Sequence, residues 1–211
     1  MKAYLTEFIG TFFLVLTIGL SVIGRDGPWA SMAPIAIGSI LMAMIFMGGH
    51  VSGAHYNPAV SLAVLIRGKM AAKDFVPYLV AQIAGAVLAA LLARYVIVGH
   101  GLDVKPLPPE KLVPVLLIEF LFTFALALVI LNVATAKGTS GNSFYGLAIG
   151  FTVTGGVIAA SGVGGGALNP AVGIGLTLMG ISIQNIWLYL VGPFAGGAVA
   201  AIVFKIQNPE G

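Results

Sequence analysis

The feature that most constrains this chain is an internal repeat. The tetrapeptide Asn-Pro-Ala-Val at 57–60 occurs again at 169–172, which is 112 positions later. Glu7 and Glu119 are separated by the same 112 positions. One tetrapeptide would carry little information, but two kinds of polar residue that keep register across the chain indicate a duplicated unit. We therefore expect a single domain, residues 1–211, made of two repeats at about 1–105 and 106–211.

The composition places this duplicated unit in a lipid bilayer. Hydrophobic residues make up 59% of the 211 residues and charged residues only 8%, and the mean hydropathy is +1.05. So few polar side chains could not cover a water-facing surface. The net charge of +3 is small, and the basic residues fall mostly between apolar stretches, which argues against nucleic-acid binding. The chain has no cysteine, so disulfides and thiolate metal sites are excluded.

Six apolar windows are long enough to cross a membrane. A helix of about 20 residues crosses a hydrocarbon core of about 30 Å, and such windows lie at 3–23, 33–51, 74–97, 112–136, 144–161 and 184–205. Three crossings per repeat is an odd number, so the second repeat is expected to be inverted relative to the first. Six basic residues on one side against four on the other favour cytoplasmic termini. We expect a multi-pass, all-α protein of the cell (plasma) membrane.

Two shorter apolar stretches, 57–66 and 169–178, reach only the membrane midplane, because ten helical residues span about 15 Å. Asn is a strong helix N-cap and Pro suits the first helical position, so Asn-Pro predicts a helix start in both places. The preceding segments, 48–53 and 161–166, are glycine-rich and are predicted to be irregular. Irregular backbone at this depth needs protein or a wet cavity around it. The inverted repeat therefore predicts two re-entrant half-helices whose N-termini meet at a lumen.

The segment 49–60, the paired Asn-Pro-Ala tripeptides and the paired glutamates together resemble the aquaporin and glycerol-facilitator family. The resemblance implies a passive channel for water and small uncharged solutes, with no cofactor, assembled as a homotetramer. It places six residues at the pore centre: Asn57, Pro58, Ala59, Asn169, Pro170 and Ala171. The asparagines would offer N–H donors to a solute, while the helix N-termini would repel cations. A purely capping role for them would leave the inverted pairing unexplained.

Four further polar residues are candidates for bracing loops or lining the pore. Glu7 and Glu119 lie inside apolar spans, where ionisable groups are functional candidates by default. The resemblance implies that Glu7 braces the loop that holds His55, and that Glu119 braces the loop at 164–168; proton transfer is the alternative. It also places His55 near the cytoplasmic mouth, where it can hydrogen-bond solutes. His50 lies five residues earlier, but the two histidines lack the further ligands of a metal site.

One position departs from the family pattern. Most members carry an arginine directly after the second Asn-Pro-Ala, where this chain has Val172. The resemblance assigns the narrowest ring of the pore to Ile37, Val157, Gly166 and Val172. This ring has no charge, no aromatic side chain and no side-chain donor, so we expect a wide, apolar selectivity filter. Glycerol, urea and undissociated metalloid hydroxides all remain candidate solutes.

Other functions stay open from the sequence alone. The uncharged ring is compatible with an ion-conducting channel of the same fold, and inverted repeats also occur in coupled secondary transporters. A structural membrane protein with a closed pore is a further alternative. An enzyme is disfavoured because neither a nucleophile with its base nor a metal cluster is visible. Small residues at Ala81 and Gly85, repeated at Gly192 and Gly196, predict a close crossing between the third and sixth spans.

Overall fold

The computed structural model describes residues 1–23, 30–97 and 105–209, and the α-helices of this part of the chain form one bundle. Short 3₁₀ turns lie at Ala30–Met32, Lys137–Thr139 and Ile183–Asn185. The α-helices are α1 (Lys2–Val22), α2 (Ala33–Ser52), α3 (Pro58–Arg67), α4 (Ala72–Val96), α5 (Pro109–Thr135), α6 (Tyr145–Ala160), α7 (Pro170–Leu178) and α8 (Ile186–Gln207).

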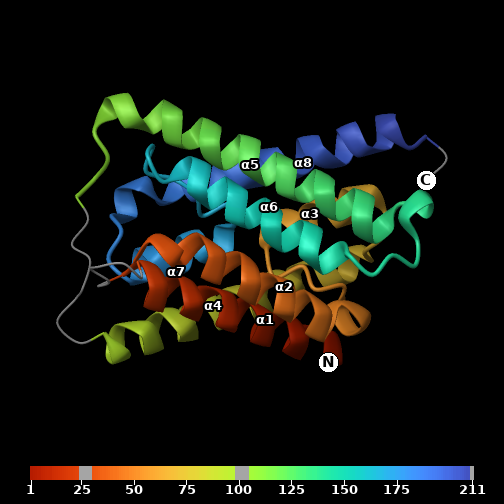
Figure 1. The fold of residues 1–211 in the computed structure, drawn as a ribbon, viewed down its shortest axis with the longest axis horizontal. Coiled ribbons are helices and arrows are strands. Elements are labelled where there is room, and N and C mark those ends of the chain that lie inside the picture. Colours follow the sequence, from red (N-terminus) through yellow and green to blue (C-terminus); the bar gives the residue numbers. More distant parts are fainter. Residues whose placement is uncertain (24–29, 98–104, 210–211) are drawn as a thin grey trace.

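The two repeats interlock through their short helices. Figure 1 shows α5 and α8 together along one edge of the bundle and α1 and α4 along the other, with α2 and α6 between them. The half-helix α3 packs on α8, and its counterpart α7 packs on α4. Each half-helix is thus held by the last helix of the other repeat. The fold is an all-α membrane fold with an inverted internal repeat, as the sequence predicts.

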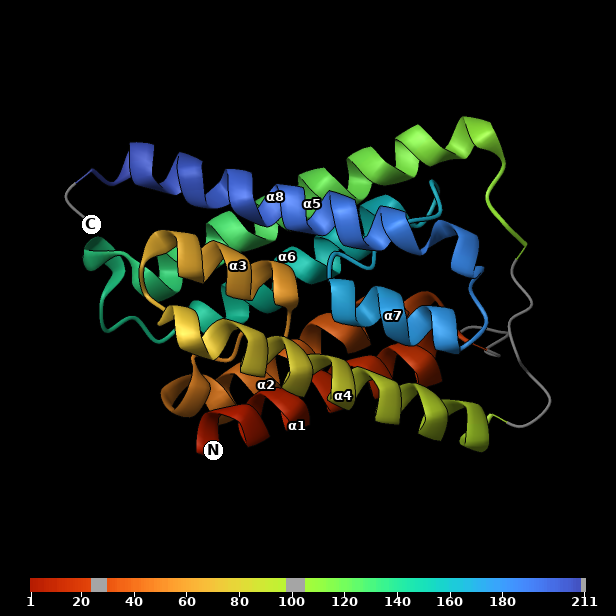
Figure 2. The same ribbon diagram turned by 180° about the vertical axis from the view of Figure 1, so that it is seen from behind.

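The short helices begin where the Asn-Pro pairs predict. Asn57 and Asn169 are the N-caps of α3 and α7, and both have extended backbone with φ of −156° and −163°. A residue before proline favours this conformation because the pyrrolidine ring excludes the helical region. Figure 2 shows α3 and α7 approaching one another from opposite ends of the bundle, and the start of α1 and the end of α8 lie toward one end.

The crossing helices differ in length. Five helical segments are long and apolar enough to span a membrane, whereas α6 has 16 residues, or about 24 Å of helix. It ends at Ala160, just before the glycine-rich segment 161–166, which is irregular as predicted. The crossing expected at 144–161 is therefore helical at Tyr145–Ala160 only and is shorter than the other five.

The prediction for the first glycine-rich segment was wrong, because α2 continues through residues 48–52 and ends only at Ser52. Gly48 serves close packing here and does not break the helix. A Cβ at this position would lie 2.0 Å from the Tyr56 hydroxyl and 2.5 Å from a methyl of Thr6. Gly53, with φ of +85°, supplies the left-handed residue that ends the helix.

The predicted crossing between the third and sixth spans was also wrong in its partners. A Cβ on Gly85 of α4 would lie 2.4 Å from the carbonyl oxygen of Phe8 in α1. A Cβ on Gly196 of α8 would lie at the same 2.4 Å from the carbonyl oxygen of Phe120 in α5. The small residues therefore bring together the first and last helices of each repeat. The half-helices α3 and α7 pack against the other faces of α8 and α4.

Candidate functional site

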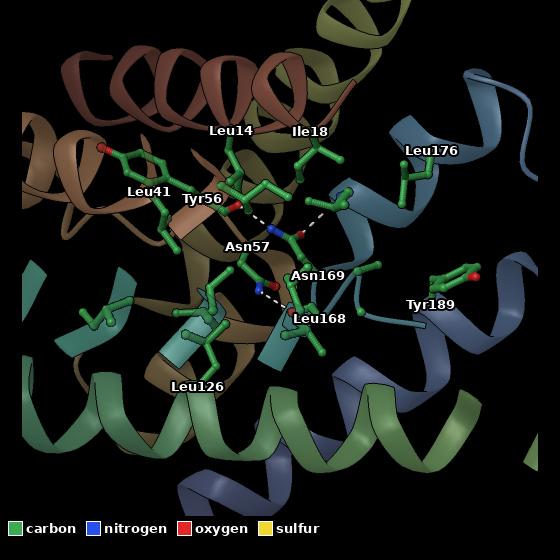
Figure 3. Close-up of a pocket in the computed structure, with 18 of the residues that line it drawn as sticks. Leu14, Ile18, Leu41, Tyr56, Asn57, Leu126, Leu168, Asn169, Leu176 and Tyr189 are labelled. Atoms are coloured by element: carbon green, nitrogen blue, oxygen red, sulfur yellow. Dashed lines mark hydrogen bonds between the residues drawn. The ribbon is translucent and has the colours of Figure 1, made fainter. Parts of the chain in front are cut away.

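A cavity of about 180 Å³ lies where the two half-helices meet (Figure 3). Both asparagines border it, as does the His55 loop. The four residues assigned to the selectivity filter come from α2, α6, the loop before α7, and α7 itself, yet all of them border this one cavity: Ile37, Val157, Gly166 and Val172. The structure thus brings the two asparagines of the predicted pore centre and the four predicted filter residues to a single space.

The two asparagines are bound reciprocally across the repeats. Asn57 Nδ2 donates to the carbonyl of Leu168 at 2.9 Å, and Asn169 Nδ2 donates to the carbonyl of Tyr56 at 2.9 Å. Each side-chain oxygen meanwhile caps its own helix, at the backbone N–H groups of Ala59 and Ala171. An amide nitrogen carries two hydrogens. One hydrogen of each asparagine therefore remains for a molecule in the cavity.

The residues before the asparagines are held in an unusual backbone conformation. Tyr56 and Leu168 are both left-handed, with φ of 48° and 53°, which costs a non-glycine residue on the order of 1 kcal/mol or more. In both cases the N–H donates to a glutamate while the C=O accepts from the opposite asparagine. Four strong hydrogen bonds thus hold two strained residues at the centre of the bundle.

Glu7 lies in α1 and is completely buried. Its Oε1 accepts hydrogen bonds from Ser52 Oγ at 2.7 Å and from the backbone N–H of His55 at 2.9 Å. Its Oε2 accepts from the backbone N–H of Tyr56 at 2.7 Å and from Gln82 Nε2 at 2.8 Å. The carboxylate therefore ties α1 and α4 to the loop that precedes α3.

Glu119 lies at the equivalent place in α5 and is also completely buried. Its Oε1 accepts from the backbone N–H groups of Gly166 at 2.6 Å and Ala167 at 2.8 Å, and its Oε2 accepts from that of Leu168 at 2.7 Å. Within the described chain no donor reaches the carbonyl groups of residues 164–167, and these residues border the cavity. The carbonyl groups of this loop are therefore not used by other backbone groups of the described chain.

His55 is joined to Glu7 through a chain of side chains. Its Nδ1 lies 3.0 Å from Ser61 Oγ, and Ser61 Oγ in turn accepts from Gln82 Nε2 at 3.0 Å. Which of these two atoms donates depends on the tautomer of the imidazole. His55 also borders the cavity, so its ring connects the Glu7 network to the inner half of the path.

Some predicted site residues lie away from the cavity. Pro58, Ala59, Pro170 and Ala171 are buried and start the half-helices, so they position the asparagines and do not border the cavity themselves. His50 lies at the end of α2 and borders a wider vestibule of about 890 Å³, which His55 also borders. The two histidines therefore share the vestibule, while only His55 reaches the inner cavity.

Sequence reasoning missed the side chains that complete the Glu7 network. Ser52, Ser61 and Gln82 are all buried and all belong to this network. Gln82 carried a usable signal, because a polar side chain inside an apolar span is a functional candidate by default. Ser52 and Ser61 carried none, since serine is common in membrane helices.

Comparison with known proteins agrees with this geometry. Residues 1–204 match the family described as major intrinsic protein. The chain belongs to that family. This confirms the resemblance that the repeated motifs indicate.

Individual relatives match over the whole chain. An aquaporin of rice, Oryza sativa subsp. japonica (Aquaporin NIP1-4), is 36% identical over 100% of this chain and 78% of its own length. A glycerol uptake facilitator protein-like 6 of Lactiplantibacillus plantarum is 33% identical over 100% of both chains. The aquaglyceroporin structure from Plasmodium falciparum superposes with a TM-score of 0.77 at 23% identity, over 99% of this chain and 97% of that one, which supports the fold.

Proposed function

We propose that the apolar ring of Ile37, Val157, Gly166 and Val172 sets the selectivity of this passive channel for water and small solutes. The single observation that carries the proposal is that these four residues border the same cavity as Asn57 and Asn169. Ile37 and Val172 are 4% and 2% exposed, so their side chains are packed in place around the path.

The physics of the ring favours solutes with an apolar edge. A solute sheds part of its hydration in a constriction, and an uncompensated polar group costs several kcal/mol there. The loop carbonyls at 164–167 offer acceptors on one wall, while Ile37 and Val157 offer hydrocarbon. A small neutral molecule with hydroxyl groups and C–H groups suits both surfaces. A cation gains nothing from the ring and meets the partial positive charge of two helix N-termini.

Glycerol is the solute that we propose first. The L. plantarum relative is named as a glycerol uptake facilitator-like protein and aligns with this chain end to end. Urea and undissociated metalloid hydroxides are neutral molecules of similar size, and we propose them as further substrates. We also propose that the chain performs no covalent chemistry and needs no cofactor.

Substituting Val172→Arg tests the assignment of the filter. A guanidinium would narrow the ring and add fixed donors, so glycerol permeability should fall on the order of tenfold, and water permeability less. Stopped-flow light scattering on proteoliposomes, challenged in turn with sucrose, glycerol, urea and arsenite, measures both. Val172→Leu is the matched control, because it adds volume without charge. Equal loss of water and glycerol in the arginine variant would refute the filter.

The alternative function has a separate measurement. The apolar ring carries no charge that would exclude cations, so an ion-conducting channel is the alternative function. Such a channel would show unitary currents in planar bilayers. We expect no such currents, since both half-helix N-termini face the cavity with their asparagines. Solute flux that depends on a proton or sodium gradient would instead indicate a coupled transporter.

We propose further that the channel is a homotetramer in the cell membrane with cytoplasmic termini, and that its single domain consists of repeats 1–105 and 106–211. The start of α1 and the end of α8 lie toward one end of the bundle (Figures 1 and 2), as an even number of crossings requires. Large apolar side chains on the outer faces of α1, α2 and α6, such as Phe13, Phe46 and Phe151, are exposed. Native mass spectrometry would test the assembly, and protease access in oriented vesicles would test the topology.

A further inference from the structure

Tyr189 is a polar side chain on the outer wall of the cavity. It lies in the first turn of α8, is 4% exposed, and borders the cavity on the Leu176 side of the asparagine pair (Figure 3). Within residues 1–23, 30–97 and 105–209, no hydrogen bond to its hydroxyl is recorded. Buried tyrosine hydroxyls normally find a partner. The Tyr189 hydroxyl oxygen is not among the fully buried atoms that lack a partner, so a molecule in the cavity that Tyr189 borders can supply one.

Its counterpart in the first repeat behaves differently. The Tyr78 hydroxyl donates to the carbonyl of Ser52 at 2.8 Å, and its ring lies against His55 with centroids 5.2 Å apart. Tyr78 is therefore committed to holding the loop before α3. The two repeats share a tyrosine at this place, but only Tyr189 keeps its hydroxyl available.

Gly173 makes the position of Tyr189 possible. A Cβ on Gly173 would lie 2.4 Å from the Cβ of Tyr189 and 3.3 Å from its Cγ. The equivalent residue in the first repeat is Ser61, whose hydroxyl joins the Glu7 network. Because residue 173 has no side chain, the aromatic ring of Tyr189 can pack against α7. This places it close to Val172 of the selectivity filter.

We propose that the Tyr189 hydroxyl is a solute-binding group of the outer chamber, and that its ligand is a small neutral compound with several hydroxyl groups. The proposal rests on the proposed channel function. The Tyr189 hydroxyl offers one hydrogen-bond donor and one acceptor. The side chains of the neighbouring selectivity filter offer neither. A polyol that gives up water at Ile37, Val157 and Val172 recovers one hydrogen bond there. Water, which keeps hydrogen bonds to neighbouring waters in a file, depends on this group less.

The variant Tyr189→Phe removes this hydroxyl and leaves the ring in place. We expect glycerol permeability to fall about fivefold, because one net hydrogen bond corresponds to about 1 kcal/mol. We expect 1,2-propanediol, which has one hydroxyl fewer, and water to change less than about twofold. The measurement is stopped-flow light scattering on proteoliposomes with each solute in turn. Tyr95→Phe is the matched control, because Tyr95 lies near the end of α4, is 77% exposed and borders neither cavity nor vestibule, and it should leave all three permeabilities unchanged.

The outcomes distinguish a failure of the Tyr189 proposal from a failure of the channel function. A selective fall in glycerol permeability in the Tyr189 variant alone supports the proposal. Equal falls for glycerol, 1,2-propanediol and water would overturn it in favour of a structural role. An unchanged glycerol permeability would overturn it while leaving the channel function intact. If the unaltered protein carried no solute at all, the proposed function would fail and this proposal with it.

Discussion

Glu7 and Glu119 occupy equivalent places in the two repeats but are satisfied by different chemistry. Glu7 accepts hydrogen bonds from two backbone amides and from the side chains of Ser52 and Gln82. Glu119 accepts from three backbone amides. The first carboxylate therefore belongs to a side-chain network, whereas the second belongs to the loop itself.

The difference shows what the repeat has kept and what it has not. The left-handed residues Tyr56 and Leu168 and their contacts with the opposite asparagines recur in both halves. The surrounding side chains do not recur, since His55 corresponds to Ala167 and Ser61 to Gly173. The shared backbone can thus carry a polar inner half and an apolar outer half. Lumen chemistry varies independently of the framework that brings the half-helices together.

Glu119→Gln should show the largest effect, because all three recorded partners of this carboxylate are backbone groups that cannot rotate. The new amide would turn one acceptor into a donor that faces an N–H group. We expect the free energy of unfolding to fall by about 3 kcal/mol, since a buried N–H without an acceptor costs about 1–3 kcal/mol and charge-assisted bonds are lost as well. Thermal unfolding in detergent measures this. A loss of unfolding free energy no larger than that of Glu7→Gln would show that the two carboxylates are not held differently.

Gly85→Ala and Gly196→Ala probe a feature that the halves share. Each added Cβ would lie 2.4 Å from a backbone carbonyl oxygen of the neighbouring helix, so the helices must move apart. We expect each variant to lose about 2 kcal/mol, within the usual range for overpacking, and the two losses to be equal. Gly155→Ala is the control, because nothing lies within 4 Å of its added Cβ. Unequal losses would show that the helix crossings have diverged as well.

Glu7→Gln should have the smallest effect of the three. Gln82 Oε1 is buried and has no partner among the described residues, so rotation of this amide can present an acceptor to the new one. We expect a loss of about 1 kcal/mol, the net value of one hydrogen bond, in the same thermal assay. Adding Gln82→Leu removes this compensation and should make the double variant clearly less stable than the sum of its parts. If the losses of unfolding free energy in the two single variants simply added in the double variant, the Gln82 amide would not rotate in this way.

Much of the fold could be predicted because its signals are local. The starts of α3 and α7 fall within one residue of the predictions, since the capping of asparagine and the fixed φ of proline act over a few residues. The continuation of α2 to Ser52 could not be predicted, because Gly48 and Gly49 read as helix breakers until the approach of Tyr56 is known. The role of Gln82 likewise required knowing that α4 lies against α1.

Three properties could be read from the amino-acid sequence: the chain lies in a membrane, it is duplicated, and two of its helices begin at Asn-Pro pairs. Composition, register and local propensity are readable without any contact between distant residues. Three features could be known only from the packed helices. Each asparagine reaches the carbonyl of the opposite loop, and four ring residues from separate segments border one cavity. Among the described residues, the Tyr78 hydroxyl has a hydrogen-bond partner and the Tyr189 hydroxyl has none recorded. These features depend on residues up to 113 positions apart in sequence, and helix packing alone brings such residues together.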